Sequence, residues 1–280
     1  MQKSGANIAR HWLWMTDIHL DFLDETQLAE FYSRIQGAKA DGLMITGDIG
    51  TGPTVANFLR QLTESFPGPI AFVLGNHDFY RSGFGVVRNE IQELCSKTER
   101  LLYLPDLQGV PLPGGITLIG QDGWGDGQAG NYNASDVELN DFQLIDELRG
   151  KSKQDRLQLI AEIGVRDAEN AKEKLHQALA RSRDVIFLTH VPPFPEASLG
   201  PTGLSDPDFL PFFCCHTMGE MLFEIMSAHP DNRLFVFCGH THSPAVARIL
   251  PNLIIRSAGA VYGQPAFAGE IDVTRLDEWK

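Results

Sequence analysis

The sequence predicts an α/β fold, and two observations carry this prediction. Six short apolar runs of strand length lack the polar alternation of a half-exposed strand, which is typical of strands covered on both faces. Amphipathic helical patterns occupy much of the chain between these runs, and elements that alternate in this way indicate an α/β architecture. The predicted strands are His11–Thr16, Gly42–Thr46, Pro69–Leu74, Gly115–Ile119, Asp184–Thr189 and Arg233–Cys238.

The first predicted helix follows Asp24, where Leu28, Phe31 and Ile35 recur at intervals of three and four residues. Asp24 is a suitable N-cap, and Gln27 stands three residues later, as a capping box requires. Similar spacing predicts helices over Val55–Leu62, Ala168–Leu179 and Met218–Ile225, the last behind a Thr217-x-x-Glu220 capping box. We interpret the methionines of the last helix as core packing.

The composition is that of a globular protein with an acidic balance. The 280 residues include 23 Lys and Arg against 36 Asp and Glu, so the net charge is −13. Proteins dedicated to duplex nucleic acid need a basic surface to displace counterions, and we therefore expect no such partner. A locally positive cleft made by bound metal ions remains compatible with this charge. No linker divides the chain, so we expect a single domain over residues 1–280.

The cysteines and the first residues bear on the cellular setting. Four cysteines are too few for a disulfide scaffold, and their spacing matches no zinc or redox motif, so we expect buried free thiols. The apolar run after Arg10 is short and is interrupted by Asp17, so we expect neither a signal peptide nor a membrane span. These features favour a cytoplasmic protein. The cysteines are Cys95, Cys214, Cys215 and Cys238.

One segment has the composition of an insertion. Asp122–Leu148 contains seven acidic residues and no Lys or Arg, and it opens with a glycine-rich stretch that regular secondary structure does not accommodate. We expect a loop or small lobe here, over residues 122–165 at its widest. Its charge is explained either by a solvated face or by a cap that turns away polyanions.

Polar residues with metal-binding chemistry follow five of the predicted strands. They form five blocks: Asp17-x-His19, Gly47-Asp48, Gly75-Asn76-His77-Asp78, His190, and Gly239-His240-Thr241-His242. In open α/β sheets ligands bind beyond the carboxyl ends of the strands, so these residues should converge in space. Each block alone is compatible with a turn or a hydrogen-bonded core histidine. Their order, their placement at strand ends and their combination favour a functional site.

This ordered set of blocks resembles the calcineurin-like metallophosphoesterase superfamily. The blocks present here match that family's D-x-H, G-D, G-N-H-[DE], H and G-H-x-H series from Asp17 to His242. The resemblance implies two packed mixed β-sheets flanked by helices, an αββα sandwich. Within the superfamily the pattern is most similar to the class III cyclic-nucleotide phosphodiesterases, since the second and third blocks depart from the protein phosphatase pattern.

The resemblance also implies a binuclear metal site. Asp17, His19 and His242 would bind one ion, Asn76, His190 and His240 would bind the other, and Asp48 would bridge both. Imidazole and carboxylate ligands suit two divalent or trivalent ions such as Mn, Fe or Zn. In the family a metal-bridging hydroxide attacks phosphorus in line. His77 would then act as the general acid, and Asp78 would fix the tautomer of His77.

The expected substrate is a small-molecule phosphate ester, and the expected activity is that of a phosphodiesterase. Arg81 could clamp a phosphate oxygen or be an ordinary exposed arginine, while Asp122 and Trp124 could wall the cleft. Two alternatives stay open: a phosphomonoesterase or nucleotide pyrophosphohydrolase on the same site, and a non-catalytic interaction scaffold of the same fold. We expect no membrane partner, and the sequence leaves the oligomeric state open.

Overall fold

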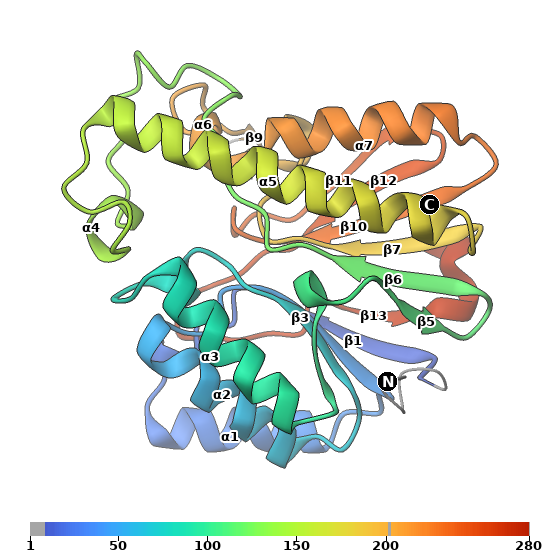
Figure 1. Cartoon of the computed structure of the whole chain (residues 1–280). Coiled ribbons are helices and arrows are strands. Elements are labelled where there is room, and N and C mark those ends of the chain that lie inside the picture. The colour runs from blue at the N-terminus through green and yellow to red at the C-terminus, as the bar shows by residue number, and fades with distance from the viewer. Residues whose placement is uncertain (1–8, 201–202, 280) are drawn as a thin grey trace.

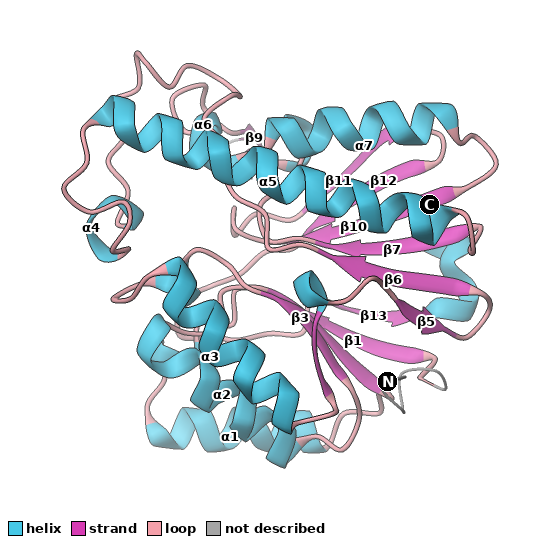
Figure 2. Cartoon of the chain, in the orientation of Figure 1, coloured by secondary structure: helices cyan, strands magenta, loops and turns pink. Residues whose placement is uncertain are grey.

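Two mixed β-sheets pack face to face, and helices cover the outer face of each sheet (Figures 1 and 2). The computed structural model describes residues 9–200 and 203–279. The order of the first sheet is β13-β1-β2-β3-β4, in which β1 to β4 are parallel and β13 is antiparallel to β1. These strands are β1 (His11–Met15), β2 (Gly42–Thr46), β3 (Ile70–Val73), β4 (Leu101–Tyr103) and β13 (Gly269–Asp272).

The second sheet has the order β11-β12-β10-β7-β6-β5, with four parallel central strands and an antiparallel strand at each edge. A two-stranded hairpin, β8 (Leu199–Gly200) with β9 (Gly203–Leu204), lies outside both sheets. The sheet is made of β5 (Val110–Leu112), β6 (Ile116–Gly120), β7 (Asp184–Leu188), β10 (Arg233–Cys238), β11 (Ala245–Leu250) and β12 (Leu253–Ser257). All six strands predicted from apolar runs are confirmed, and so is the sandwich of two mixed sheets.

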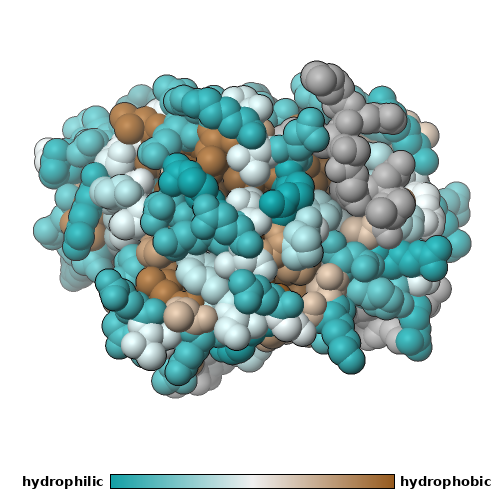
Figure 3. Space-filling view, turned by 90° about the horizontal axis from the view of Figure 1, so that it is seen from below, coloured by the Kyte–Doolittle hydropathy of each residue, from teal (hydrophilic) through white to brown (hydrophobic). Residues whose placement is uncertain are grey.

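Helices α1, α2 and α3 lie against the first sheet, and α5 and α7 lie against the second (Figure 1). The outer surface of the first helical layer is largely hydrophilic, with small scattered apolar areas (Figure 3). No helix in the described part of the chain has the length and apolar character that crossing a membrane requires. The helices are α1 (Glu25–Gln36), α2 (Gly52–Ser65), α3 (Phe84–Lys97), α4 (Asp141–Leu144), α5 (Lys153–Leu179), α6 (Leu210–Phe213) and α7 (His216–Ala228).

Three apolar layers hold this sandwich together. Between the sheets, Trp12 and Trp14 of β1 pack with Phe235 and Phe237 of β10. The other side chains of the same strands face the helices, so each central strand is buried on both faces, as its continuous apolar sequence predicts. The methionines of α7 lie in the outer core, and all four cysteines are buried and outside any disulfide, which confirms both interpretations.

The backbone N–H groups in the first turns of α1 and α7 find their hydrogen-bond acceptors in different ways. The Asp24–Gln27 capping box of α1 is present as predicted. The predicted capping box of α7 is wrong, because the helix begins at His216 and Thr217 therefore lies inside its first turn. The backbone N–H and hydroxyl of Thr217 instead donate to Asp126, a buried carboxylate far away in the sequence. A long-range cap of this kind leaves no local sequence signal.

The acidic segment between β6 and α5 contains one short helix, α4, and otherwise irregular backbone. Helix α5 begins at Lys153, within the widest range expected for the insertion. Neither explanation of the segment's charge holds for Asp122, Asp126 and Asp141, because all three are buried and bonded to other parts of the chain. Figure 1 shows α4 on the side of the molecule where the parallel strands of both sheets end.

Candidate metal centre

The five polar blocks converge at the carboxyl ends of β1, β2, β3, β7 and β10. Backbone hydrogen bonds join neighbouring blocks: the N–H of His19 donates to the carbonyl of Asp48, and the N–H of Gly239 donates to that of His190. The centre therefore draws on both sheets, and two glycines let the blocks approach closely. A Cβ at Gly75 would overlap Asp48 Oδ1, and a Cβ at Gly239 would overlap Asp17 Oδ2.

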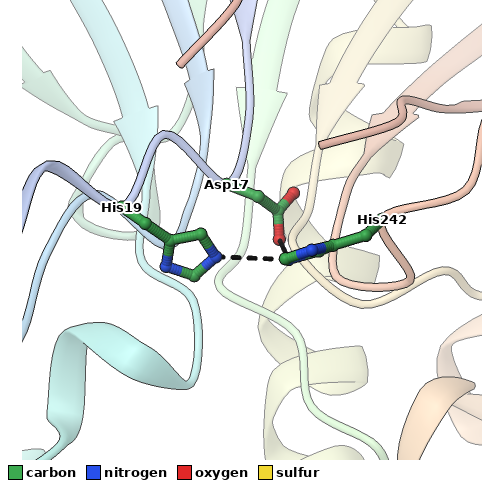
Figure 4. Close-up of side chains that lie close together, drawn as sticks. All are labelled: Asp17, His19 and His242. Atoms are coloured by element: carbon green, nitrogen blue, oxygen red, sulfur yellow. Dashed lines mark hydrogen bonds and ion pairs between the residues drawn. The ribbon is translucent and has the colours of Figure 1, made fainter. Parts of the chain in front are cut away.

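Asp17, His19 and His242 form the first donor group, which is drawn in Figure 4. The Nε2 atoms of His19 and His242 lie 3.2 Å apart, and His242 Nε2 lies 3.4 Å from Asp17 Oδ1. Asp17 is also held from behind, since Thr16 Oγ1 and the backbone N–H of His240 donate to its carboxylate. Three potential ligand atoms thus point toward one space.

Asn76, His190 and His240 form the second donor group. Asn76 Oδ1 lies 3.1 Å from His190 Nε2 and 3.0 Å from His240 Nδ1, and the two ring nitrogens lie 3.2 Å apart. Asp48 stands between the two groups. Its Oδ2 lies 3.7 Å from His19 Nε2, and its Oδ1 lies 3.4 Å from His190 Nε2.

The second donor group fits a six-coordinate metal ion. Donor atoms at right angles around one ion, each about 2.1 Å away, lie about 3.0 Å from one another. The separations among Asn76 Oδ1, His190 Nε2 and His240 Nδ1 match that spacing. The other ring nitrogen of each histidine donates to a carbonyl, from His190 Nδ1 to Thr46 and from His240 Nε2 to Phe212. These bonds leave the facing nitrogens unprotonated, as metal ligation requires.

The ionisation states suit metal binding too. Burial lowers the pKa of His19 to about 2 and that of His240 to about 3, and it also lowers the pKa of His190, so all three imidazoles are neutral near pH 7. Burial and the neighbouring Asp17 raise the pKa of Asp48. Burial opposes ionisation of Asp17, but the hydrogen bond from His242 and the surrounding histidines lower its pKa overall. A cation between the two groups would stabilise both carboxylates.

Backbone strain is concentrated in this centre. Six non-glycine residues in the described part of the chain have positive φ, and five of them belong to the five polar blocks. Each left-handed residue costs on the order of 1–3 kcal/mol, so the surrounding fold must enforce these turns. The five residues are Asp17, His19, Asp48, His240 and His242.

His77 lies at the edge of the centre and is half-buried. Its ring stacks on Tyr80 with centroids 4.2 Å apart and lies 4.5 Å from the ring of His19. The expectation that Asp78 fixes the tautomer of His77 is wrong. The Asp78 carboxylate is fully buried and accepts hydrogen bonds from the backbone N–H groups of Ile49, Gly50 and Gly75. Burial raises the pKa of Asp78 to about 7, against the lowering effect of these donors.

A cleft of about 330 Å³ opens over the centre. A larger open groove, about 810 Å³, lies at the amino ends of β7 and β10 and contains no residue of the five blocks. The cleft over the centre is lined by Asp48, Asn76, His77, Tyr80, Leu139, Asn140, Asp141, Phe213, His240, Thr241, His242 and Tyr262.

The three residues predicted to contact substrate have different positions. Asp122 does not wall the cleft: it is 1% exposed and accepts hydrogen bonds from Leu74, Arg88 and Tyr103. Trp124 is also buried, and it lines a small inner cavity beneath Asn76 and His240 instead of the open cleft. Arg81 is exposed, and its charge lowers the otherwise raised pKa of Asp21.

Sequence reasoning missed residues that complete the centre. Asp141 accepts hydrogen bonds from Asn76 Nδ2 at 2.9 Å and from the hydroxyl of Tyr80 at 2.5 Å. Tyr262 lies against His19 and His242, and Phe213 lies against His240. The only sequence signal for Asp141 was its place in an acidic segment, while Tyr262 stands alone in a loop rich in glycine and alanine.

Comparisons with known proteins agree with this geometry. The sequence model of the family described as calcineurin-like phosphoesterase matches residues 12–244. A phosphopantetheinyl hydrolase from Mycobacterium tuberculosis has a similar structure, with a TM-score of 0.65 at 13% identity over 92% of this chain and 91% of that one. A dimetal phosphatase from Danio rerio has a TM-score of 0.53 at 12% identity over 94% and 90% of the two chains.

No curated protein matches the sequence significantly. The family match covers most of the chain, includes all five blocks, and agrees with the convergence of their side chains on one centre. The chain belongs to the calcineurin-like phosphoesterase family and is a metal-dependent phosphoester hydrolase.

Proposed function

We propose that this chain is a small-molecule phosphodiesterase with a binuclear metal centre. Asp17, His19 and His242 hold one ion, and Asn76, His190 and His240 hold the other. The position of Asp48 carries this proposal, because one of its carboxylate oxygens faces His19 and the other faces His190. A carboxylate placed in this way suits a ligand shared by two ions. When bound, the metal pair lowers the pKa of a water molecule and withdraws charge from the phosphoryl oxygens.

The cleft favours a diester over more highly charged esters. None of the residues that line it, within the described part of the chain, is Lys or Arg, so the proposed metal pair would supply most of its positive charge. A diester carries one negative charge near pH 7, whereas a monoester carries up to two and a pyrophosphate more. The metal pair alone can meet the single negative charge of a diester, whereas the further charges of the other esters would find no Lys or Arg in this cleft.

His77 is the proposed general acid. Hydrolysis forms a bond from water oxygen to phosphorus and breaks the bond from phosphorus to the leaving oxygen, which needs a proton. Burial lowers the pKa of His77 to about 4, and a bound anionic ester acts in the opposite direction because it favours the protonated ring. The ring of His77 lines the cleft beside Asp48, where it can reach the leaving oxygen. Arg81 remains a proposed phosphate contact from outside the cleft.

The test is a comparison of two esters after the metal content has been measured by elemental analysis. With added Mn²⁺, we expect bis(4-nitrophenyl) phosphate to be hydrolysed with a higher kcat/KM than 4-nitrophenyl phosphate. The reverse preference would establish a phosphomonoesterase instead. A metal-loaded protein that hydrolyses neither ester nor any cyclic nucleotide would overturn the proposal.

A further inference from the structure

Tyr262, which lines the cleft, is in contact with a second exposed aromatic ring, that of Phe22. Tyr262 is 46% exposed and Phe22 is 52% exposed, and their ring centroids are 4.8 Å apart with an angle of 39° between the planes. Aromatic side chains offer a ligand a large and rigid apolar surface, so an exposed pair beside the cleft is a candidate binding surface. We call this pair the Tyr262–Phe22 wall.

The Tyr262–Phe22 wall adjoins the reacting groups. The ring of Tyr262 lies 4.5 Å from the ring of His19 and 4.8 Å from that of His242, and it lines the cleft. Its hydroxyl lies 3.5 Å from His77 Nε2. Because His77 is the proposed donor to the leaving oxygen, the leaving group must extend past Tyr262.

A second aromatic contact lies beside the other donor group. The ring of Phe213 lies 4.6 Å from that of His240, and the exposed ring of Phe209 lies 6.0 Å from Phe213. Aromatic rings therefore line the cleft beside both donor groups, and none of its lining residues in the described ranges is Lys or Arg. These surfaces suit a flat, uncharged ring and offer nothing to a second phosphate group.

We propose that the Tyr262–Phe22 wall is a subsite for a planar ring carried by the leaving group of the ester, with a nucleobase as the matching chemistry. This inference rests on the proposed function and specifies its substrate class. Stacking on aromatic side chains tolerates any base, because every base has a π-face. The wall therefore selects for a ring without selecting its identity.

The experiment compares two cyclic diesters that differ only in the ring. Adenosine 2′,3′-cyclic phosphate and 1-O-methylribose 2′,3′-cyclic phosphate have the same reacting group, and in both the leaving oxygen stays on the ribose. The measured quantity is the ratio of kcat/KM for the first ester to kcat/KM for the second. In the wild type we expect kcat/KM to be about tenfold or more higher for the adenosine ester, through a lower KM. A factor of this size corresponds to the free energy of one base stacked on an aromatic side chain.

The variants separate the wall from general effects. Tyr262→Ala and Phe22→Ala should each reduce the ratio, whereas Tyr262→Phe keeps the ring and should retain it. Phe223→Ala is the control, because Phe223 is similarly exposed but lies on α7, outside the cleft lining. The two wall variants test the same claim, so a folding failure of one leaves the other. A wild-type ratio near one, or a ratio that is unchanged in Tyr262→Ala or Phe22→Ala, would overturn the inference. Hydrolysis of either ester would still support the proposed function.

Saturation-transfer NMR with adenosine gives a readout that needs no turnover. Saturation transfer from the protein to the base protons of adenosine that is lost in Tyr262→Ala supports the wall. If this result is found and neither ester is hydrolysed, the proposed function fails and the wall stands. Absence of transfer to the base protons in the metal-loaded wild type overturns the inference.

Discussion

Asp141 Oδ1 accepts a hydrogen bond from Asn76 Nδ2 at 2.9 Å, and this bond decides which way the Asn76 amide points. Because the NH₂ group faces Asp141, the amide oxygen faces His190 and His240. The carboxylate is buried and also accepts the hydroxyl hydrogen of Tyr80. A residue of the acidic segment thus orients a proposed ligand of the second ion.

Replacing Asp141 by Ala should weaken binding of the second ion, because the Asn76 amide could then rotate and present its NH₂ group. Loss of such an orienting partner typically costs about 10–100-fold in metal affinity. Titration of the metal-free protein with Mn²⁺, followed by calorimetry, measures this loss. Asp136→Ala is the matched control, since Asp136 lies in the same segment and is exposed. Equal affinity in both variants would show that Asp141 does not orient Asn76.

Metal binding should also stabilise the fold, because ions that bind only the native state add to the free energy of unfolding. At a free Mn²⁺ concentration of about 100 times Kd the gain is about 2.7 kcal/mol, which corresponds to a Tm increase on the order of 5 °C. Asp48→Asn should reduce this increase, since Asp48 faces both donor groups. His216→Ala should keep it, because His216 is exposed on α7. Thermal unfolding of each protein in Mn²⁺ and in EDTA gives the increase in Tm that the metal causes. If this increase is as large in Asp48→Asn as in the wild type, the bridging role of Asp48 is contradicted.

Six of the parallel strands and the five blocks could be predicted because their signals are local. Continuous apolar runs mark strands buried on both faces, and the blocks stand directly after them. Edge strands such as β5 and β11 were missed because they are partly exposed and lack that signal. Asp141, Tyr262 and the Asp126 cap were missed for a different reason: each acts on residues far away in the sequence, so only the folded chain places them.

The misassigned residues share one physical feature. Asp122 and Asp78 follow strands, as ligands do, but their carboxylates point into the protein and satisfy backbone N–H groups. Sequence position placed them at the correct end of the sheet and could not give the direction of the side chain. The direction depends on which donors the surrounding loops leave unpaired.

His77→Ala should slow esters with poor leaving groups far more than nitrophenyl esters, because a nitrophenolate leaves without a proton. General acid catalysis contributes roughly 10²–10⁴-fold, so a loss of that size is expected for a cyclic nucleotide. The losses in kcat for bis(4-nitrophenyl) phosphate and for a 2′,3′-cyclic nucleotide measure the difference. His176→Ala, outside the five blocks, serves as the control. Equal losses on both esters would remove His77 from the acid role.

Asp122→Ala should lower stability and leave KM unchanged. Asp122 is paired with Arg88 in the interior, and removing one partner of a buried ion pair typically costs about 3–5 kcal/mol. Urea unfolding measures this cost, and KM for bis(4-nitrophenyl) phosphate reports any contact with substrate. Asp146→Ala is the control, because Asp146 and its partner Arg149 are both exposed. An increase in KM without a loss of stability would show that Asp122 contacts the substrate.

Asp78→Asn separates a structural role for Asp78 from a direct role in proton transfer. The wild-type carboxylate accepts N–H groups from Ile49 and Gly50 through one oxygen and from Gly75 through the other. An asparagine places an NH₂ group against one of these donors, and each buried group left unsatisfied costs about 1–3 kcal/mol.

We therefore expect Asp78→Asn to lower the free energy of unfolding in urea with EDTA present, and to weaken Mn²⁺ binding because the loops of Asp48 and Asn76 are both loosened. Its kcat should fall by the same factor for nitrophenyl and cyclic nucleotide esters, unlike that of His77→Ala. If Asp78 instead fixed the tautomer of His77, the variant would keep its stability and reproduce the leaving-group dependence of His77→Ala. The two outcomes differ in both measurements, so one variant decides between them.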